Sequence, residues 1–466
     1  MKILYIHMIS KGRLPILMFL VAAFICISCE DFVEIDNPDS ELTGDVVFDD
    51  PTTVEAAIID IYSQMRDNAL SSGGSSGVGY LMGHYADELT LFTNEQPALL
   101  SFYENSLLPS NDIVLNVWNS SYNLIYAANA IKEGVEGSDA LSEEERSQFL
   151  GEVLFIRAYL HFYLTNLYGS VPYVQTTDYL VNSEIPKSST AEVYENVVLD
   201  LLEARELLPT TIDATNTRPN KWVATSLLSR AYLYSQQWEL ARTMAEEVLN
   251  SGPYSLNESV SDVFLKNSSE TIWQFDASMP GANTIDALTY VFVSGPPPNT
   301  ALSAELVESF ETGDERFADW VGTASNGTET WYHPFKYKLN SNTGETQELS
   351  IVIRLAELYL ISAEANARLG NIAIAQQRLN TIRNRAGLSL FSDTDTTALL
   401  DAILHERRIE LFTEHGHRWF DLKRTERATE QLTPIKPNWD PTDVVLPIPE
   451  AELLLNPNLL PQNDGY

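Results

Sequence analysis

Residues 221–250 read KWVATSLLSRAYLYSQQWELARTMAEEVLN, which is two apolar helical stretches around the polar break SQQ. The same spacing of small and apolar residues returns between residues 363 and 382. Small side chains let two antiparallel helices approach closely. The matching positions are Ser229, Ala241, Ala245 and Val248 in the first pair and Ala363, Ala375, Leu379 and Ile382 in the second. Two helix pairs with one spacing predict a scaffold of tetratricopeptide-like repeats.

Helical periodicity extends over most of the remaining chain, so the predicted fold class is mostly α. Ser142 and Glu145 have the spacing of a capping box. The helix that begins after them is expected to pack on one face, through a stripe of Ile156, Tyr159, Tyr163 and Leu167. We expect helices at residues 51–68, 112–134, 142–168, 190–208, 221–235, 238–250, 350–369, 371–386 and 397–413.

Two segments of different amino-acid composition interrupt the helical pattern. Residues 69–108 contain the run SSGGSSG, and residues 262–349 contain GPPP and the aromatic run WYHPFKY. Long irregular segments inside a compact protein are often binding surfaces. The helical scaffold is therefore expected at about residues 40–260 and 350–430, with the two irregular segments as the ligand-binding parts.

The start of the chain has the features of an export signal. Basic residues precede an apolar run from Ile16 to Ile27, which is shorter than the ~20 residues of a membrane span and suits a signal peptide. Ser28-Cys29 then resembles the processing site of bacterial lipoproteins, in which the cysteine becomes the acylated first residue. This predicts a leader of residues 1–28 and a lipid on Cys29. The alternative is a plain secretory signal with an incidental cysteine.

The composition is strongly acidic, with 65 Asp and Glu against 29 Lys and Arg and a formal net charge of −36. Such a charge opposes binding to nucleic acid and adsorption to anionic lipid. We therefore expect no nucleic-acid partner, and any link to a membrane through the lipid. Cys29 is the last cysteine of the chain, which excludes a disulfide framework and a cysteine-based zinc site in the mature protein.

The stretch richest in reactive side chains is HERRIELFTEHGHRWFDLKR, residues 405–424. Its carboxylates could form a catalytic cluster, but alternating Arg and carboxylate on helices more often forms ion pairs that fix helix packing. His415 and His417 could bind a metal, but residues two apart point to different sides of a helix and no third ligand is evident. We predict a structural role for this stretch, with no catalytic residues, no metal site and no cofactor.

Candidate ligand-binding residues come from the irregular segments instead. A neutral glycan site needs exposed aromatic faces for the apolar faces of sugar rings, together with amide, carboxylate or hydroxyl partners. The alternative is that these aromatic side chains cover the core beneath them. The candidates are Tyr80, His84, Tyr85 and Phe92 in the first segment, and Trp320, Asn326, Trp331 and Tyr332 in the second.

Several segments resemble the SusD/RagB family of outer-membrane nutrient-binding lipoproteins. The similar segments occur in the family's order, at residues 29–34, 157–173, 354–388, 405–424 and 446–466. The resemblance implies tetratricopeptide-like units with an irregular ligand-binding subdomain, and docking onto a SusC-like TonB-dependent transporter. It also implies a lipid-anchored protein on the outer face of the outer membrane that captures an oligosaccharide, or in some members a peptide, without catalysis.

Two functions of other classes remain open. A surface glycoside hydrolase would need two carboxylates ~5–9.5 Å apart across a cleft, and a chain with 65 acidic residues does not exclude such a pair. A helical scaffold that binds another protein through its concave face is the second, although it does not require the aromatic insertion at residues 262–349.

Overall fold

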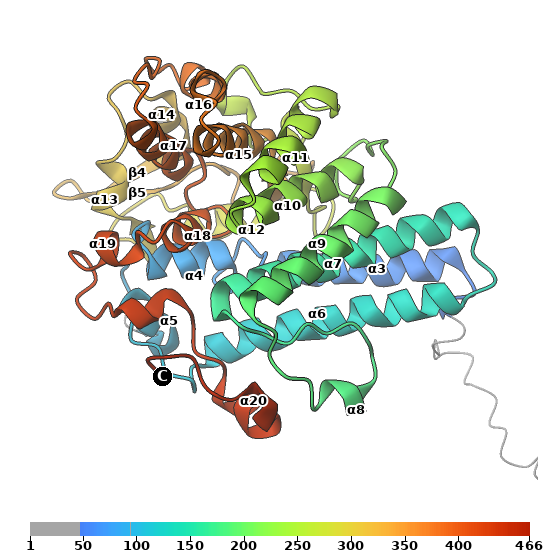
Figure 1. Cartoon of the computed structure of the whole chain (residues 1–466). Coiled ribbons are helices and arrows are strands. Elements are labelled where there is room, and N and C mark those ends of the chain that lie inside the picture. The colour runs from blue at the N-terminus through green and yellow to red at the C-terminus, as the bar shows by residue number, and fades with distance from the viewer. Residues whose placement is uncertain (1–46, 94) are drawn as a thin grey trace, which may run out of the picture. The chain divides into compact units, whose positions relative to one another are not determined.

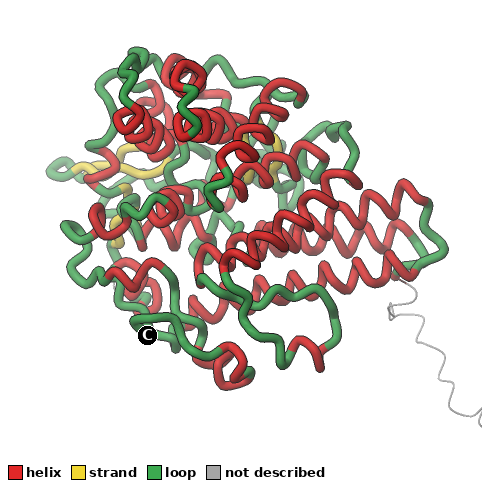
Figure 2. The backbone as a smooth tube through the Cα atoms, viewed as in Figure 1, coloured by secondary structure: helices red, strands yellow, loops and turns green. Residues whose placement is uncertain are grey.

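The computed structural model describes residues 47–93 and 95–466, so the predicted leader and Cys29 lie outside the described residues. Residues from Phe48 onward form one unit. It is mostly helical, as the sequence predicts (Figures 1 and 2). Its long helices are α3 (Pro51–Asp67), α6 (Asp112–Gly137), α7 (Glu143–Tyr168), α9 (Thr190–Leu207), α10 (Lys221–Tyr234), α11 (Trp238–Ser251), α15 (Leu355–Arg368), α16 (Ile372–Arg385) and α17 (Thr396–Glu410).

The two repeat-like helix pairs form as the sequence predicts. Helix α10 packs on α11 and α15 packs on α16, while α11 also packs on α15, so the pairs stack on each other. Every one of the eight positions with matched spacing is buried. Small side chains at the contacts allow this close packing.

Helix α7 lies at the centre of the helical part, where it packs on α3, α6 and α9 (Figure 1). The capping box is confirmed, because the Ser142 N–H donates to Glu145 Oε2 at 2.9 Å and the Glu145 N–H donates back to Ser142 Oγ at 3.3 Å. The prediction of a single packing face is wrong. All residues from Phe149 to Tyr168 except Leu150 are buried, because neighbouring elements cover α7 on several sides.

The helix expected from residue 350 begins later. Ile351–Arg354 form the strand β6, and α15 follows directly. The run Ile351, Val352, Ile353 is β-branched and fully buried, which favours a strand over a helix. Strand β6 pairs with β2 (Thr271–Gln274) in an antiparallel ladder.

Two further ladders lie within the segments predicted to be irregular. Strands β4 (Val321–Ser325) and β5 (Thr330–Pro334) form a hairpin. Strand β1 (Leu89–Leu91) pairs antiparallel with β3 (Thr300–Leu302), with Leu89 opposite Leu302. This ladder brings the two irregular segments together although more than 200 residues separate them in the chain.

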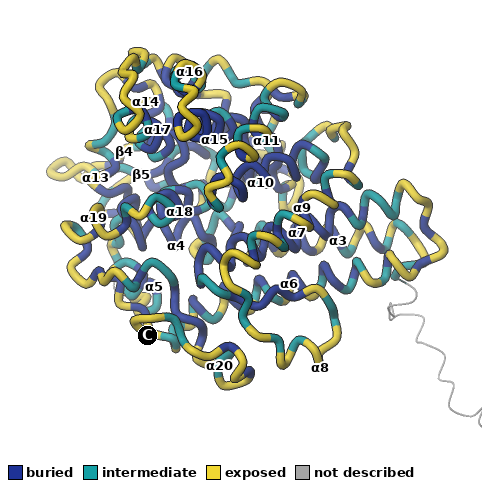
Figure 3. Tube along the Cα trace, viewed as in Figure 1, coloured by how far each residue is buried: buried dark blue, intermediate teal, exposed yellow. Residues whose placement is uncertain are grey.

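Short helices account for much of the remaining backbone. Helix α4 is buried along its whole length, whereas α8 is mostly exposed (Figure 3). Among the described residues, no helix combines the length and apolar character that a membrane span requires. The short helices are α4 (Val78–Tyr85), α5 (Pro97–Tyr103), α8 (Tyr179–Asn182), α12 (Ile285–Tyr290), α13 (Ala304–Val307), α14 (Glu315–Trp320), α18 (His417–Arg424), α19 (Ala428–Leu432) and α20 (Glu450–Leu455).

Candidate ligand-binding site

Parts of the two irregular segments form one surface, which we call the loop face: residues 71–77, 92–93 and 95–96, residues 293–299 and the β4–β5 hairpin. Beyond the β1–β3 ladder, the Phe92 N–H donates to the Asn299 carbonyl oxygen at 2.7 Å. A Cβ on Gly73 would clash with the Asp286 side chain at the start of α12. Glycine at this position therefore lets the SSGGSSG loop lie directly against the second segment.

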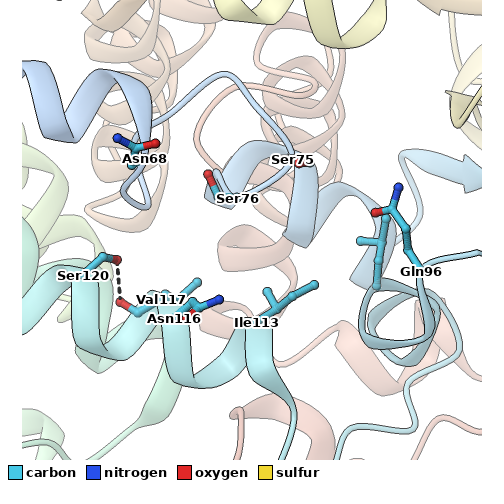
Figure 4. Close-up of a pocket in the computed structure, with 9 residues that line it drawn as sticks. Asn68, Ser75, Ser76, Gln96, Ile113, Asn116, Val117 and Ser120 are labelled. Carbon is cyan, nitrogen blue, oxygen red and sulfur yellow. Dashed lines mark hydrogen bonds between the residues drawn. The ribbon is translucent and has the colours of Figure 1, made fainter.

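A pocket of about 250 Å³ opens between residues 68–76, the start of α5 and helix α6. Figure 4 shows Asn68 and Ser76 on one side, Asn116 and Ser120 of α6 on the other, and Gln96 at a separate edge. The volume is near the lower end of the range for small-molecule sites, about 300–1,000 Å³. Such a space suits one or two sugar rings of a longer chain.

The lining of the pocket is polar at the rim and apolar at the base. Leu99 and Val117 are buried, while the exposed amide side chains of Asn68, Gln96 and Asn116 make no hydrogen bond with the described part of the chain. Primary amides offer both donors and acceptors, which matches sugar hydroxyl groups. The lining contains no charged residue. The pocket therefore suits a neutral ligand and offers no acid pair for hydrolysis.

Aromatic side chains on the loop face supply apolar surface next to the strands. Phe92 is 42 % exposed, and Trp331 and Tyr332 on β5 are half-buried. The Trp331 ring lies against Gly295 and packs beside Ala301 of β3. One face of Trp331 is thus supported by the protein, as a stacking platform for a sugar requires.

Three other candidates are buried, and their rings have no face open to a ligand in this structure. Trp320 is 0 % exposed, and its indole N–H donates to the Val260 carbonyl oxygen at 2.9 Å. Tyr85 donates from its hydroxyl to the Asp443 carbonyl oxygen at 2.8 Å, and Tyr80 packs on Tyr290. These rings close the core instead, because loop aromatics that meet a neighbouring element are covered by it.

His84 is also buried in the interior. Its Nδ1 lies 2.9 Å from the Tyr80 carbonyl oxygen, and its Nε2 lies 2.9 Å from the Thr300 hydroxyl. Burial lowers the pKa of His84 to about 3, so the imidazole is neutral at physiological pH. A hydrogen must then be on Nδ1 to meet the carbonyl oxygen. His84 links α4 to β3 and stabilises the contact between the two segments.

Asn326 is exposed at the tip of the β4–β5 hairpin. Its Oδ1 accepts hydrogen bonds from the backbone N–H groups of Thr328 and Glu329, both at 2.9 Å. Gly327 follows with a φ of 88°. Asparagine here shapes the turn, a common use of this side chain, and only its amide nitrogen stays open to solvent.

Sequence reasoning missed the pocket residues themselves. The SSGGSSG run marked Ser75 and Ser76 as part of an irregular segment, but no pattern singled out Asn68, Gln96 or Asn116. Asn116 belongs to α6, which the periodicity assigned to the scaffold. A polar residue on an exposed helix face carries no local signal that distinguishes a site from a solvated surface.

The motif-rich stretch at residues 405–424 forms ion pairs, as predicted. Glu410 is fully buried and meets Arg316 at 2.9 Å, Arg354 at 2.5 Å and Arg385, a group that we call the Glu410 cluster. Although burial alone would raise the pKa of Glu410, the three guanidinium groups hold it well below its usual range. The cluster joins α14, β6, α16 and α17, so its role is to fix packing.

The other charged pairs of this stretch have the same character. Arg418 donates to both carboxylate oxygens of Asp87, at 2.8 and 2.7 Å, and Arg407 donates to Asp421 at 2.7 Å. Among the described residues, no group of three His, Cys, Asp or Glu side chains is arranged to hold a metal ion. His417 is buried, and burial holds its pKa well below the usual value.

Two family models match separate parts of the chain. A SusD-like family model described as starch-binding and associating with the outer membrane matches residues 31–233, and the SusD family model matches residues 303–466. The chain belongs to the SusD family. Residues 234–302 lie between the two matched parts and contain α11, β2, α12 and β3.

Individual proteins of this family are similar over most of the chain. A SusD-like protein of Formosa agariphila is 27 % identical, covering 97 % of this chain and 99 % of its own. A laminarin-binding SusD-like protein has a TM-score of 0.76 at 24 % identity, covering 89 % and 99 % of the two chains. Surface glycan-binding protein A of Bacteroides thetaiotaomicron, solved with laminarihexaose, has a TM-score of 0.75 at 20 % identity and covers 88 % and 99 %. At these identities, the solved structures establish a shared fold.

Proposed function

We propose that this SusD-family chain is a non-catalytic surface lipoprotein that binds a neutral oligosaccharide on the loop face and delivers it to a SusC-like TonB-dependent transporter. The observation that carries the proposal is the pocket beside the SSGGSSG loop, where unpaired amides surround an apolar base without a charged residue. Family membership supports the location and the partner. The solved relatives that bind laminarin and laminarihexaose support a glycan as the ligand class.

A panel of neutral hexasaccharides tests the ligand class by calorimetric titration of the detergent-solubilised protein. Laminarihexaose, cellohexaose, maltohexaose and xylohexaose cover β- and α-linked chains. We expect binding to at least one without any release of shorter products. Product release would favour a glycoside hydrolase. Binding of a hexapeptide mixture but of no sugar would favour a peptide ligand instead.

Anchoring is tested at Cys29, which lies outside the described residues. Cys29→Ala should give an unlipidated protein that no longer sediments with membranes, since no other segment of the mature sequence is long and apolar enough to insert. Cys26→Ala, within the leader, is the matched control and should leave the lipid in place. A lipidated, membrane-bound Cys29→Ala protein would contradict this assignment.

The transporter partnership is tested by affinity isolation in mild detergent. We expect a large outer-membrane barrel in roughly equal amount to the lipoprotein. Repeated recovery of the chain alone, under conditions in which known complexes of this kind survive, would argue against delivery through such a barrel.

A further inference from the structure

A second, larger cavity lies apart from the pocket of the loop face. This groove of about 570 Å³ runs between α6, the loop that carries α8, and α20 near the carboxyl terminus; we call it the α6 groove. Figure 1 shows α8 and α20 on the same side of α6. None of the residues that line the groove belongs to the loop face. Its volume falls within the range of sites for small organic ligands, about 300–1,000 Å³.

One wall of the groove is a regular stripe on α6. Asn119, Tyr122, Asn123 and Tyr126 all line it, and their spacing places them on one face of the helix. Tyr126 is 52 % exposed. The Tyr122 hydroxyl donates to the Pro172 carbonyl oxygen at 2.9 Å, which fixes the orientation of its ring. The exposed amides of the two asparagines make no hydrogen bond with the described residues.

The opposite wall adds a third tyrosine and an unsatisfied acceptor. Tyr179 is 74 % exposed at the start of α8. Asn182 donates from Nδ2 to the Thr176 carbonyl oxygen at 2.7 Å, but its Oδ1 is buried and has no partner among the described residues. Asn182 is therefore a lining residue whose Oδ1 is enclosed by the protein, and the exposed ring of Tyr179 is what this wall presents to a ligand.

The walls are held together by hydrogen bonds between the α8 loop and the carboxyl-terminal segment. Asn456 Nδ2 donates to the Ile185 carbonyl oxygen at 2.8 Å, and Asn458 Nδ2 donates to the Glu184 carbonyl oxygen at 2.7 Å. Lys187 Nζ donates to the Pro461 carbonyl oxygen at 2.5 Å. The α8 loop and the carboxyl-terminal segment therefore stay together without a ligand, and the groove is pre-formed.

The charges of the lining residues indicate which class of ligand fits the groove. Neither Lys nor Arg lines the groove, and Glu452 is its one carboxylate. Partial burial raises the pKa of Glu452. An anionic ligand would find no cation there, and a cationic one would find a single, partly shielded carboxylate. Aromatic rings beside amides and hydroxyls, without paired charge, match a neutral sugar chain.

We propose that the α6 groove is a second neutral-oligosaccharide site, in which Tyr126 and Tyr179 stack on sugar rings and Asn119 and Asn123 bind the hydroxyl groups. The inference rests on the proposed function for the class of ligand but uses none of the residues of the loop face. Two sites on one chain would let the protein hold a long glycan at two points and gain avidity.

The test uses calorimetric titration of the detergent-solubilised protein with laminarihexaose, cellohexaose, maltohexaose and xylohexaose. We expect two sites per chain for the hexasaccharide that binds. In a Trp331→Ala background, which weakens the loop face, Tyr126→Ala with Tyr179→Ala should reduce the remaining affinity by about tenfold or more. Both tyrosines are exposed, so the melting temperature should not change. Tyr126→Phe with Tyr179→Phe keeps the rings and should retain most of the affinity.

Three results would contradict the proposed second site, and each has a different consequence for the proposed function. If titration gives one site per chain, and binding is lost in Trp331→Ala but unchanged in the tyrosine variant, the groove is not a sugar site and the proposed function still holds. If the tyrosine variant binds sugar as the wild type does but no longer copurifies with a barrel, the groove is a protein-docking surface. The exposed apolar side chains of Leu180 and Leu454 next to the groove would suit such a role. Absence of binding to every hexasaccharide in the wild type rejects both proposals for this ligand class.

Discussion

The Glu410 cluster and the loop face are both rich in polar side chains, but they use them in opposite ways. In the cluster, the buried carboxylate of Glu410 meets the guanidinium groups of Arg316 at 2.9 Å and Arg354 at 2.5 Å. In the pocket beside the loop face, the exposed side chains of Asn68, Gln96 and Asn116 make no hydrogen bond with the described chain. Paired polar groups stabilise packing, whereas unpaired exposed ones are available to a ligand. The part of the sequence richest in motifs is therefore structural, and the plainer part is the candidate site.

The largest expected effect comes from breaking the Glu410 cluster. Glu410→Ala leaves three arginines in the interior without their shared carboxylate, which should lower the free energy of unfolding by about 3–5 kcal/mol. Chemical denaturation measures this loss. Glu239→Ala, which removes an exposed ion pair with Arg242, is the matched control and should leave the denaturation midpoint nearly unchanged. Similar midpoints for the two variants would contradict a stabilising role for the cluster.

Two tryptophans in one segment sharpen the comparison between core and site. Trp320 is buried and Trp331 is half-buried on the loop face. Trp320→Ala should cost about 3–5 kcal/mol of stability and leave the affinity of the folded fraction intact. Trp331→Ala should weaken binding of the hexasaccharide by about 2 kcal/mol, roughly thirtyfold, with a smaller loss of stability.

Calorimetric binding beside thermal unfolding separates these two variants. An affinity loss confined to Trp320→Ala would reverse the assignment, because the ring that closes the core would then be needed by the ligand. Unchanged affinity in Trp331→Ala and in Phe92→Ala would remove the aromatic platform from the loop face.

Acid should affect the two regions differently. Arg354 and Lys336 outweigh the opposite effect of burial and lower the pKa of Glu414, a neighbour of the cluster, to about 2. Because this folded-state pKa lies below the unfolded value of about 4.5, the contribution of Glu414 to stability is present above pH 4.5 and is lost as the pH falls toward 2. The pocket of the loop face has no titratable lining residue, so affinity should stay constant from about pH 5 to about pH 8.

Denaturation and titration across this range test the difference. Glu414→Gln should be less stable than the wild type at neutral pH and should lose less stability on acidification. An affinity that changes several-fold between pH 5 and pH 8, in protein that remains folded, would place a titrating group in the site that the pocket does not contain.

The smallest expected effect concerns a single amide of the pocket. Asn116→Ala should weaken binding by about 1 kcal/mol, roughly fivefold, because one hydrogen bond to a neutral hydroxyl is worth about that much. Asn116 is exposed on α6, so stability should not change. Asn196→Ala, on α9 and outside the pocket lining, is the control for loss of an amide elsewhere on the surface. Equal affinity of both variants would exclude Asn116 from the site.

The sequence by itself determined the helices and the spacing of the repeats. Periodicity, the capping box at Ser142 and the small residues at Ala241 and Ala375 are local signals, and a helix depends mainly on residues within one or two turns. The sequence also identified the ion-pairing character of residues 405–424, since alternating Arg and carboxylate on a helix rarely has another use. It marked the segments that form the loop face, because their composition does not suit a regular helix.

Only the tertiary structure decided which residues of those segments reach solvent. Trp320 and Trp331 lie in the same irregular segment of the sequence, yet Trp320 is buried against Val260 and Lys336 whereas Trp331 lies half-buried on strand β5. The β1–β3 ladder, the pocket at Asn116 and the α6 groove each join elements that are distant in the chain. Exposure depends on what the rest of the fold places over a side chain, and that information is not local.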